Sequence, residues 1–276
     1  MTLPKLPTGD IRTAAELVAG IVSNEPVNAE YRLMVLDAPS AVATAMPGQF
    51  FHLLCPADGA TQPFFRRPMS IYRIDRAEGR LSFLYKVTGS GTRTMATLRA
   101  GDTINVLGPL GIGFSLPPAG SPIVVLARGV GLATLGPLVP WAHSKGHAVT
   151  AILSARAPDL LMSVERMRAD GAEIVTVTDA EGTSSPDRVE AILRRLHGEG
   201  RMGAIYTCGS NRLMLLAQRL AGELGLFGEV AMEQQMACGL GMCFCCVRSF
   251  REGDRTVHRR VCCEGPVFPL QDAMSW

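Results

Sequence analysis

The sequence has few aromatic residues, almost no net charge and little cysteine outside one region. Phe, Trp and Tyr make up 6% of the 276 residues, and the formal net charge is +2. This small charge gives no reason to expect a nucleic-acid or acidic-membrane partner. No apolar run reaches the ~18 residues that a membrane-spanning helix needs. The first ten residues, MTLPKLPTGD, lack the continuous apolar stretch of a secretory signal. We therefore expect a cytoplasmic protein.

Disulfides are also not expected. Seven of the eight cysteines lie at or after Cys208, and the chain is long enough to fold without such cross-links. A hydrophobic content of 47% with 19% charged residues allows a sizeable core and excludes general disorder. The length favours two or three domains.

The cysteines near the end of the chain have a specific spacing. Cys238, Cys243 and Cys246 form a C-x4-C-x2-C run, and Cys262 follows 16 positions later. This is the plant-type ferredoxin spacing for a [2Fe-2S] cluster. We expect Gly239 and Gly241 to take positive φ, so that the backbone can wrap closely around the cluster.

Two alternatives remain for this region. On spacing alone, either Cys262 or its neighbour Cys263 can be the fourth ligand, and Cys245 is read as a non-ligand. A tetrahedral zinc site is the weaker interpretation, because it normally shows two short pairs of cysteines.

The chain before the cysteines changes its pattern near residue 118. Residues 20–118 contain short alternating segments rich in Val, Ile, Phe and Tyr, which predict a small antiparallel barrel with a short helix at 94–98. After them, five apolar runs alternate with helical patterns, which predicts a parallel sheet covered on both faces. Helices are expected from Pro186 to Gly198, and from an Asn211 N-cap to Gly225.

Two motifs in the first part can bind a diphosphate. Arg67, in RRPMS, can pair with phosphate oxygens in bidentate fashion, and Ser70 can hydrogen-bond a phosphate or a ring edge. The turn LYKVTGSGTRT contains Gly91 and the hydroxyl of Thr92, which can approach a pyrophosphate. By itself, RRPMS is better explained as a solvated pair of surface arginines, and the glycine turn is equally well an ordinary hairpin.

A third motif, ARGVGLATL, follows the first strand of the parallel sheet. Gly129 and Gly131 occupy the position where such a sheet binds a dinucleotide, although Thr134 stands where a third glycine would fall. Pro137 and Pro140 make the following helix short, late or kinked. Further polar or small residues end the later strands at the same edge: Ser154, Arg156, Asp179, Gly182, Cys208 and Gly209.

In this order, the motifs resemble the electron-transfer subunit of type B dihydroorotate dehydrogenase, within the ferredoxin reductase superfamily. The resemblance extends from about Gly20 to Phe268, and RRPMSIY and the terminal cysteine pattern with VCCEGPVF are its most specific parts. It implies an FAD-binding barrel at 1–118, an NAD(P)-binding α/β domain at 119–228 and a [2Fe-2S] segment at 229–276.

The resemblance also assigns site residues. It places the cluster on Cys238, Cys243, Cys246 and Cys262, which resolves the choice in favour of Cys262. It places FAD on Arg67, Pro68, Met69, Ser70, Leu84, Tyr85, Lys86, Gly91 and Thr92, and the nicotinamide nucleotide on Gly129, Gly131, Cys208 and Gly209. Relatives usually have glycine, proline and proline where Arg128, Thr134 and Ser210 stand here, and the choice between NAD and NADP stays open.

The function implied is electron transfer with a partner. An FMN-containing catalytic subunit in a hetero-oligomer would oxidise dihydroorotate, and the electrons would pass through the cluster and FAD to NAD(P). No side chain is expected to be catalytic, because the cofactors carry the chemistry. Met242, Phe244 and Val247 are equally compatible with docking that subunit or with shielding the cluster.

The five histidines, His52, His143, His147, His197 and His258, are expected at the surface or with satisfied hydrogen bonds. Two other functions remain as alternatives: a reductase serving a ferredoxin, an oxygenase or another dehydrogenase, and a zinc-stabilised binding module without enzymatic activity.

Overall fold

The computed structural model describes residues 14–57 and 63–275. The first ten residues, which are expected to lack a secretory signal, lie outside the described residues. The chain forms two compact units. Unit 1 contains the chain up to Gly113 together with residues 232–250 and 256–267. Unit 2 contains Phe114–Ala231, Arg251–Arg255 and the residues from Phe268 onwards. None of the described helices is both long and apolar enough to cross a membrane.

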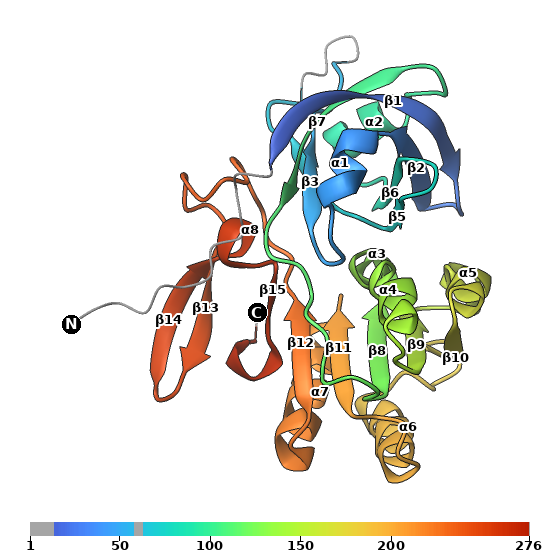
Figure 1. Cartoon of the computed structure of the whole chain (residues 1–276), viewed down its shortest axis with the longest axis vertical. Helices are drawn as coiled ribbons and strands as arrows, with labels where there is room; N and C mark the ends of the chain where they lie inside the picture. Colours follow the sequence, from blue (N-terminus) through green and yellow to red (C-terminus); the bar gives the residue numbers. More distant parts are fainter. Residues whose placement is uncertain (1–13, 58–62, 276) are drawn as a thin grey trace. The chain divides into compact units, whose positions relative to one another are not determined.

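The first part of unit 1 is a curled antiparallel sheet of seven strands in the order β4-β3-β7-β1-β2-β6-β5 (Figure 1). This confirms the predicted antiparallel barrel. The strands are β1 (Ala15–Pro26), β2 (Tyr31–Asp37), β3 (Phe50–Leu53), β4 (Arg67–Ser70), β5 (Arg73–Asp75), β6 (Arg80–Lys86) and β7 (Thr103–Leu110). Two short helices, α1 (Pro39–Thr44) and α2 (Ser90–Met95), lie between them in sequence.

Alternation along the strands decides which side chains enter the barrel core. On β3, Phe51 and Leu53 are fully buried members of this core. Phe50 and His52 therefore point to the opposite face of the same strand, and both are also buried. On β6, Phe83 and Tyr85 enter the core in the same way. The barrel thus has a second, buried face on β3 that is not part of its core.

One detail of the barrel differs from the sequence prediction. The predicted helix at 94–98 begins earlier, at Ser90. The hydroxyl of Thr92 accepts hydrogen bonds from the N–H groups of Thr88 and Gly89 and so stabilises this earlier start.

Unit 2 contains a parallel sheet, and the predicted five strands are all present. The order is β10-β9-β8-β11-β12-β15, with β8 (Ile123–Arg128), β9 (Val149–Ala155), β10 (Ala172–Thr178), β11 (Ala204–Cys208), β12 (Phe227–Ala231) and β15 (Val267–Pro269). Strands β8, β9 and β11 are almost entirely buried, as expected for a sheet with covered faces.

The helices of unit 2 follow their capping signals. α6 (Pro186–Gly198) starts after Ser185, whose hydroxyl accepts from the N–H of Arg188, and ends as predicted. α7 (Asn211–Leu224) is capped by Ser210 and not by Asn211, so the predicted cap is wrong by one residue. Gly225 ends α7 with φ 64°. The prolines divide the first helix into α3 (Leu132–Leu135) and α4 (Leu138–Ser144), and α5 (Val164–Ala169) precedes β10.

The cysteine segment includes elements that were not predicted. β13 (Val247–Glu252) and β14 (Arg255–Arg260) form a two-stranded hairpin, which leads into α8 (Val261–Glu264). This hairpin is the turn that brings the chain from Cys246 back to Cys262. The division into three domains at 118 and 228 stays a prediction.

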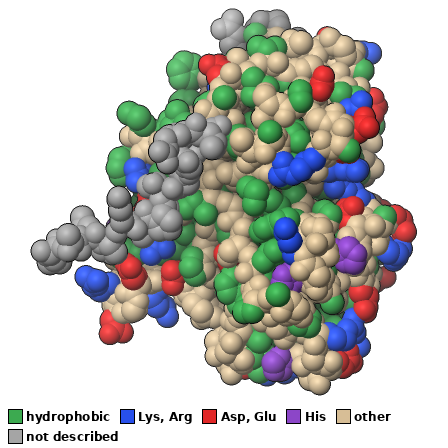
Figure 2. Space-filling model, in the orientation of Figure 1, with side chains coloured by type: hydrophobic (Ala, Val, Ile, Leu, Met, Phe, Trp, Pro, Cys, Tyr) green, Lys and Arg blue, Asp and Glu red, His purple; other side chains and the backbone are tan. Residues whose placement is uncertain are grey.

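Charge is mixed on the molecular surface. On the face drawn in Figure 2, basic and acidic side chains are interspersed, in keeping with the net charge of +2.

Candidate cofactor sites

The cysteine loop has the backbone that its glycines predict. Gly239 has φ 71° and Gly241 has φ 79°, in the left-handed region that favours glycine. A Cβ added at Gly241 would lie 2.7 Å from Sγ of Cys263, so glycine is needed there for close packing. Cys263 therefore packs closely against Gly241.

The four predicted ligands form two pairs. The thiol of Cys243 donates to the sulfur of Cys238, and the thiol of Cys262 donates to the sulfur of Cys246 and to that of its neighbour Cys263. Among the described residues, no three His, Cys, Asp or Glu side chains converge as they would around one metal ion. Two thiolates for each of two irons are the donor set of a [2Fe-2S] cluster, so the pairs fit this group.

The loop also stabilises thiolates, which are the form that binds iron. Burial raises the pKa of Cys238, but hydrogen bonds from the backbone N–H groups of Leu240, Cys243 and Met242 outweigh it and bring the pKa down to about 7. A hydrogen bond from Cys262 lowers the pKa of Cys246 to about 6 despite its burial. The donated proton correspondingly raises the pKa of Cys262.

Exposure differs between the two pairs. Cys246 and Cys262 are buried, whereas Cys243 is exposed and Cys238 is partly exposed. Met242 and Phe244, next to Cys243, have 80% and 63% of their surface exposed. The Cys238–Cys243 side of the loop is therefore the side open to solvent.

Arg260 fixes the loop to the segment that returns. Its guanidinium donates to the carbonyl of Gly241 at 3.0 Å and pairs with Glu264 at 2.8 Å. It also lies over the ring of Phe244, 5.2 Å from the centroid. These contacts connect the first half of the cysteine pattern to the second.

The expectation for the histidines is wrong for His52. Its side chain is fully buried, and neither ring nitrogen has a hydrogen-bond partner in the described part of the chain. Burial, with the nearby charge of Arg66, lowers the pKa of His52 to about 4. A Cβ added at Gly239 would lie 2.9 Å from both Cε1 and Nε2 of this ring. His52 thus lies directly against the cysteine loop.

The two predicted diphosphate motifs meet in unit 1. A Cβ on Gly91 would lie 2.8 Å from Nε and 2.9 Å from Cζ of Arg67, which places the glycine turn against the guanidinium. Arg67 also donates to the carbonyl of Phe65. A guanidinium can bind a diphosphate in bidentate fashion, so an arginine held beside a glycine turn fits FAD.

Other residues of the predicted flavin site have structural partners. The hydroxyl of Tyr85 donates to Asn24 at 2.8 Å within the core, and Lys86 pairs with Glu30 at 2.7 Å. The hydroxyl of Thr92 is used in the turn before α2. Leu84 is buried on the face of β6 opposite Tyr85, and Pro68, Met69 and Ser70 are half-buried along β4.

In unit 2 the predicted nucleotide residues lie together at the carboxyl edge of the sheet. The strand order changes direction between β8 and β11, and ligands bind at such a switch point. A Cβ on Gly131 would lie 2.6 Å from the carbonyl of Cys208 and 2.7 Å from Gly209. The turns after β8 and β11 therefore touch through their backbones, and Gly129 and Gly209 both have positive φ.

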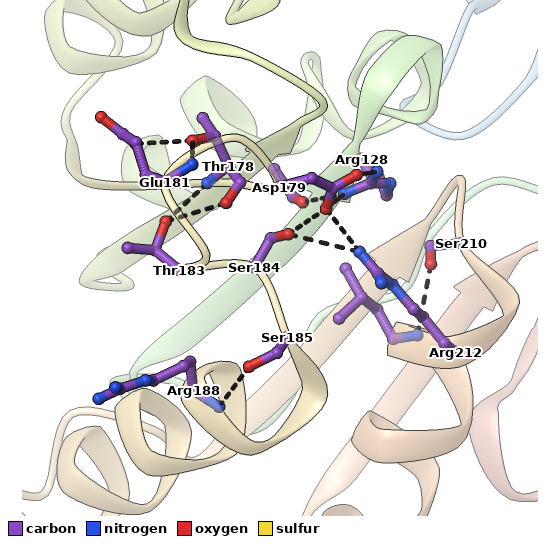
Figure 3. Close-up of polar contacts among 12 residues, drawn as sticks. Arg128, Thr178, Asp179, Glu181, Thr183, Ser184, Ser185, Arg188, Ser210 and Arg212 are labelled. Carbon is purple, nitrogen blue, oxygen red and sulfur yellow. Dashed lines mark hydrogen bonds and ion pairs between the residues drawn. The ribbon is translucent and has the colours of Figure 1, made fainter.

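A polar network lies at the same edge (Figure 3). Arg128 donates to Ser154 at 2.8 Å and to both oxygens of Asp179 at 3.2 and 2.5 Å. Arg212, from the first turn of α7, reaches the same carboxylate at 2.8 Å, and the hydroxyl of Ser184 also donates to it. The hydrogen bond from Arg128 is the main reason that the pKa of Asp179 lies far below its ordinary value.

Comparison with known proteins agrees with this geometry. A family model described as the iron-sulfur cluster binding domain of dihydroorotate dehydrogenase B matches residues 233–273. The dihydroorotate dehydrogenase B (NAD(+)) electron transfer subunit of Desulforamulus reducens is 36% identical over 238 residues, 86% of this chain and 89% of the relative. That of Bacillus caldolyticus is 33% identical over 225 residues, 80% and 84% of the two chains.

Solved structures show the same fold. An NADH-dependent reduced ferredoxin-NADP oxidoreductase, studied for flavin-based electron bifurcation, has a TM-score of 0.78 at 25% identity and covers 93% of this chain, with 89% of its own length matched. A ferredoxin NADP+ reductase from Neisseria gonorrhoeae, solved with FAD and NADP, has a TM-score of 0.59 at 20% identity, with 80% of this chain and 95% of that chain matched.

The barrel, the parallel sheet and the cysteine loop define an oxidoreductase of the ferredoxin reductase type with an iron-sulfur segment. Its expected cofactors are those of that class: FAD, a [2Fe-2S] cluster and a nicotinamide nucleotide. The chain belongs to the family of electron-transfer subunits of dihydroorotate dehydrogenase B. The recognition, fold class and electron-transfer function predicted from the sequence are therefore confirmed.

Sequence reasoning missed two features of these sites. The burial of His52 had a signal, because the residue lies inside the otherwise apolar strand QFFHLL. For the network around Asp179, the sequence carried only a partial signal. Asp179 was placed at the correct edge, but nothing in the sequence indicated that Arg128 and Arg212 would share its carboxylate.

Proposed function

We propose that this chain carries electrons between an FMN-containing dihydroorotate dehydrogenase subunit and NAD, and that it does so in the cytoplasm, where its free thiols stay reduced. The observation that carries the proposal is the composition of unit 1. The barrel with Arg67 and the loop with the four cysteines belong to one compact unit. Electron exchange between flavin and cluster then takes place inside one folded body.

In this proposal Cys238 and Cys243 hold one iron, and Cys246 and Cys262 hold the other. The pairing of their thiols supports this division. Backbone N–H groups around Cys238 and the hydrogen bond at Cys246 keep thiolates available near neutral pH. Cys245 and Cys263 are not ligands.

FAD is assigned to the face of unit 1 formed by β4 and the turn before α2. The guanidinium of Arg67, held against Gly91, binds the diphosphate, and Ser70 orients the ring. The remaining assigned residues shape this face: Pro68, Met69, Leu84, Tyr85, Lys86 and Thr92. The side chain of Asn24 holds the hydroxyl of Tyr85, and the hydroxyl of Thr92 fixes the backbone of the turn. Bound FAD exchanges electron pairs with the nicotinamide and single electrons with the cluster.

The nicotinamide nucleotide is assigned to Gly129, Gly131, Cys208 and Gly209 at the switch point of unit 2. Gly131 has no side chain and lies close to the backbone of Cys208, so the turn presents backbone groups that a dinucleotide can approach. We favour NAD because the similar subunits carry NAD(+) in their names.

The partner subunit is proposed to dock beside Cys243. Met242 and Phe244 are large, exposed and apolar, and they flank the exposed side of the cysteine loop. A partner on this side would cover apolar surface and bring its own redox group near the Cys238–Cys243 pair. This supports docking over shielding, because both side chains point to solvent.

The test is to purify the chain anaerobically with its copurifying subunit and to add dihydroorotate. We expect the FAD absorbance to bleach and the signal of the reduced cluster to appear only when that subunit is present, with NAD⁺ restoring the oxidised spectrum. Bleaching by NADH together with no response to dihydroorotate would instead support a reductase for a different partner. A preparation without iron, acid-labile sulfide and flavin would refute the proposal.

A further inference from the structure

His52 is a fully buried polar residue with no role in the sites above. It lies on β3, on the face opposite Phe51 and Leu53, and so it does not belong to the barrel core. Neither of its ring nitrogens has a hydrogen-bond partner among the residues described. Leaving a buried donor unpaired is unfavourable, and most buried polar groups in proteins are satisfied. The ring therefore indicates an acceptor supplied by a bound group.

The geometry shows which segment the ring faces. The Cε1–Nε2–Cδ2 edge of the imidazole faces Gly239, at 2.9, 2.9 and 3.1 Å from the position of an added Cβ. Gly239 directly follows Cys238, the first cysteine of the loop. Any side chain at position 239 would push the ring away, and φ of 71° also favours glycine there.

The protein groups around His52 do not offer that acceptor. Arg66 donates to the backbone carbonyl of His52 at 3.4 Å, and a guanidinium cannot accept a hydrogen bond. Phe50 contacts the ring at a centroid distance of 5.7 Å and has no polar atom. A cluster held by Cys238 would supply acceptors there, because its sulfurs would carry negative charge.

We propose that His52 is a positioning residue of the iron-sulfur centre, whose Nε2–H donates a hydrogen bond to sulfur at the Cys238 corner of the cluster. This inference rests on the proposed function, since it requires the cluster. Hydrogen bonds to cluster sulfurs stabilise added negative charge and help to set the reduction potential. His52 also pairs with Pro68 across β3 and β4, so the same residue connects the cluster loop to the strand of the flavin motif.

The first test starts from the wild-type protein and uses variants to assign the signal. Holoprotein labelled with ¹⁵N-histidine is reduced, and pulsed EPR on the cluster signal measures nuclear coupling. We expect one coupled histidine nitrogen. The coupling should vanish in His52→Gln and persist in His147→Gln, a control in unit 2 whose buried histidine lies 2.9 Å from the carbonyl of Ser121. An intact cluster signal without histidine coupling would overturn the proposal.

The second test separates hydrogen bonding from packing. In an EPR-monitored redox titration, His52→Leu should lower the cluster midpoint potential, while His52→Gln, which keeps an N–H donor near the position of Nε2, should stay close to the wild type. Equal shifts in both variants, or a shift confined to the flavin, would show that His52 does not donate to the cluster. A wild-type protein with no iron would instead refute the proposed function itself.

Discussion

The guanidinium of Arg67 lies against the Cα of Gly91, so closely that a methyl group on Gly91 would stand 2.8 Å from Nε. Arg67 begins β4 and Gly91 lies in α2, and the fold brings these two separate motifs into contact. Both were assigned to the flavin. The glycine thereby controls the position of the side chain that is proposed to bind the diphosphate.

Gly91→Ala should therefore weaken FAD binding while unit 1 stays folded, because the end of a flexible arginine can move away from the new methyl group. We expect about a tenfold loss of affinity, near the ~1.4 kcal/mol of one good charged hydrogen bond, and a larger loss in Arg67→Ala. Flavin fluorescence on dilution measures both. Gly20→Ala, at a position with open space around it, is the matched control. Unchanged flavin affinity in Arg67→Ala would remove its diphosphate role.

The ligand assignment predicts that neighbouring cysteines differ in their effect on cluster assembly. Cys246→Ser should abolish assembly of the cluster, whereas Cys245→Ser and Cys263→Ser should retain most of the iron and acid-labile sulfide. The reason is that Cys246 is paired with Cys262, Cys245 is exposed to solvent, and Cys263 packs against Gly241. Iron analysis and the visible spectrum decide the outcome. Equal loss in all three variants would mean that the ligands are assigned incorrectly.

The carboxylate of Asp179 holds two arginines at the edge where the nucleotide is proposed to bind. Asp179→Asn removes one negative charge and leaves Arg128 and Arg212 without their shared counter-ion. Affinity for NADH should rise about 3- to 10-fold at low salt and the gain should shrink at high salt.

The control for Asp179 is Glu190→Gln, because Glu190 also bridges two arginines, Arg194 and Arg219, on helices of the same unit. Titration of NADH by fluorescence measures both variants. Weaker binding in Asp179→Asn would show that this carboxylate contacts the nucleotide directly.

The docking surface can be tested without disturbing the cofactors. Met242→Asp should weaken association with the FMN subunit by at least about tenfold, since a charge replaces a large apolar side chain on the proposed docking surface. Iron and flavin content should not change, because Met242 is 80% exposed. Val18→Asp, at an exposed position of β1, is the control. Association measured by analytical ultracentrifugation that is unaffected by Met242→Asp would place the partner elsewhere.

Much of the fold could be predicted because it depends on local signals. The helix from Pro186 to Gly198 has its cap, its apolar spacing and its final glycine within one stretch of sequence. The positive φ of Gly239 could likewise be predicted from the cysteine spacing, because a cluster-binding loop requires a backbone that wraps closely.

The features that were missed depend on contacts between distant residues. The hairpin of β13 and β14 has no strong alternation of apolar residues, since most of its side chains are partly or fully exposed. The burial of His52 depends on a loop far along the chain that covers it. A sequence pattern within one strand cannot show which segment will lie over its second face.

The discontinuous make-up of unit 1 bears on how the protein is made. The ribosome completes the barrel strands first, then the whole of residues 114–231, and only afterwards the loop that covers His52. Delivery of iron and sulfide must consequently be a late event in biogenesis, and the β3 face that carries Phe50 and His52 stays uncovered until the residues after Ala231 have emerged.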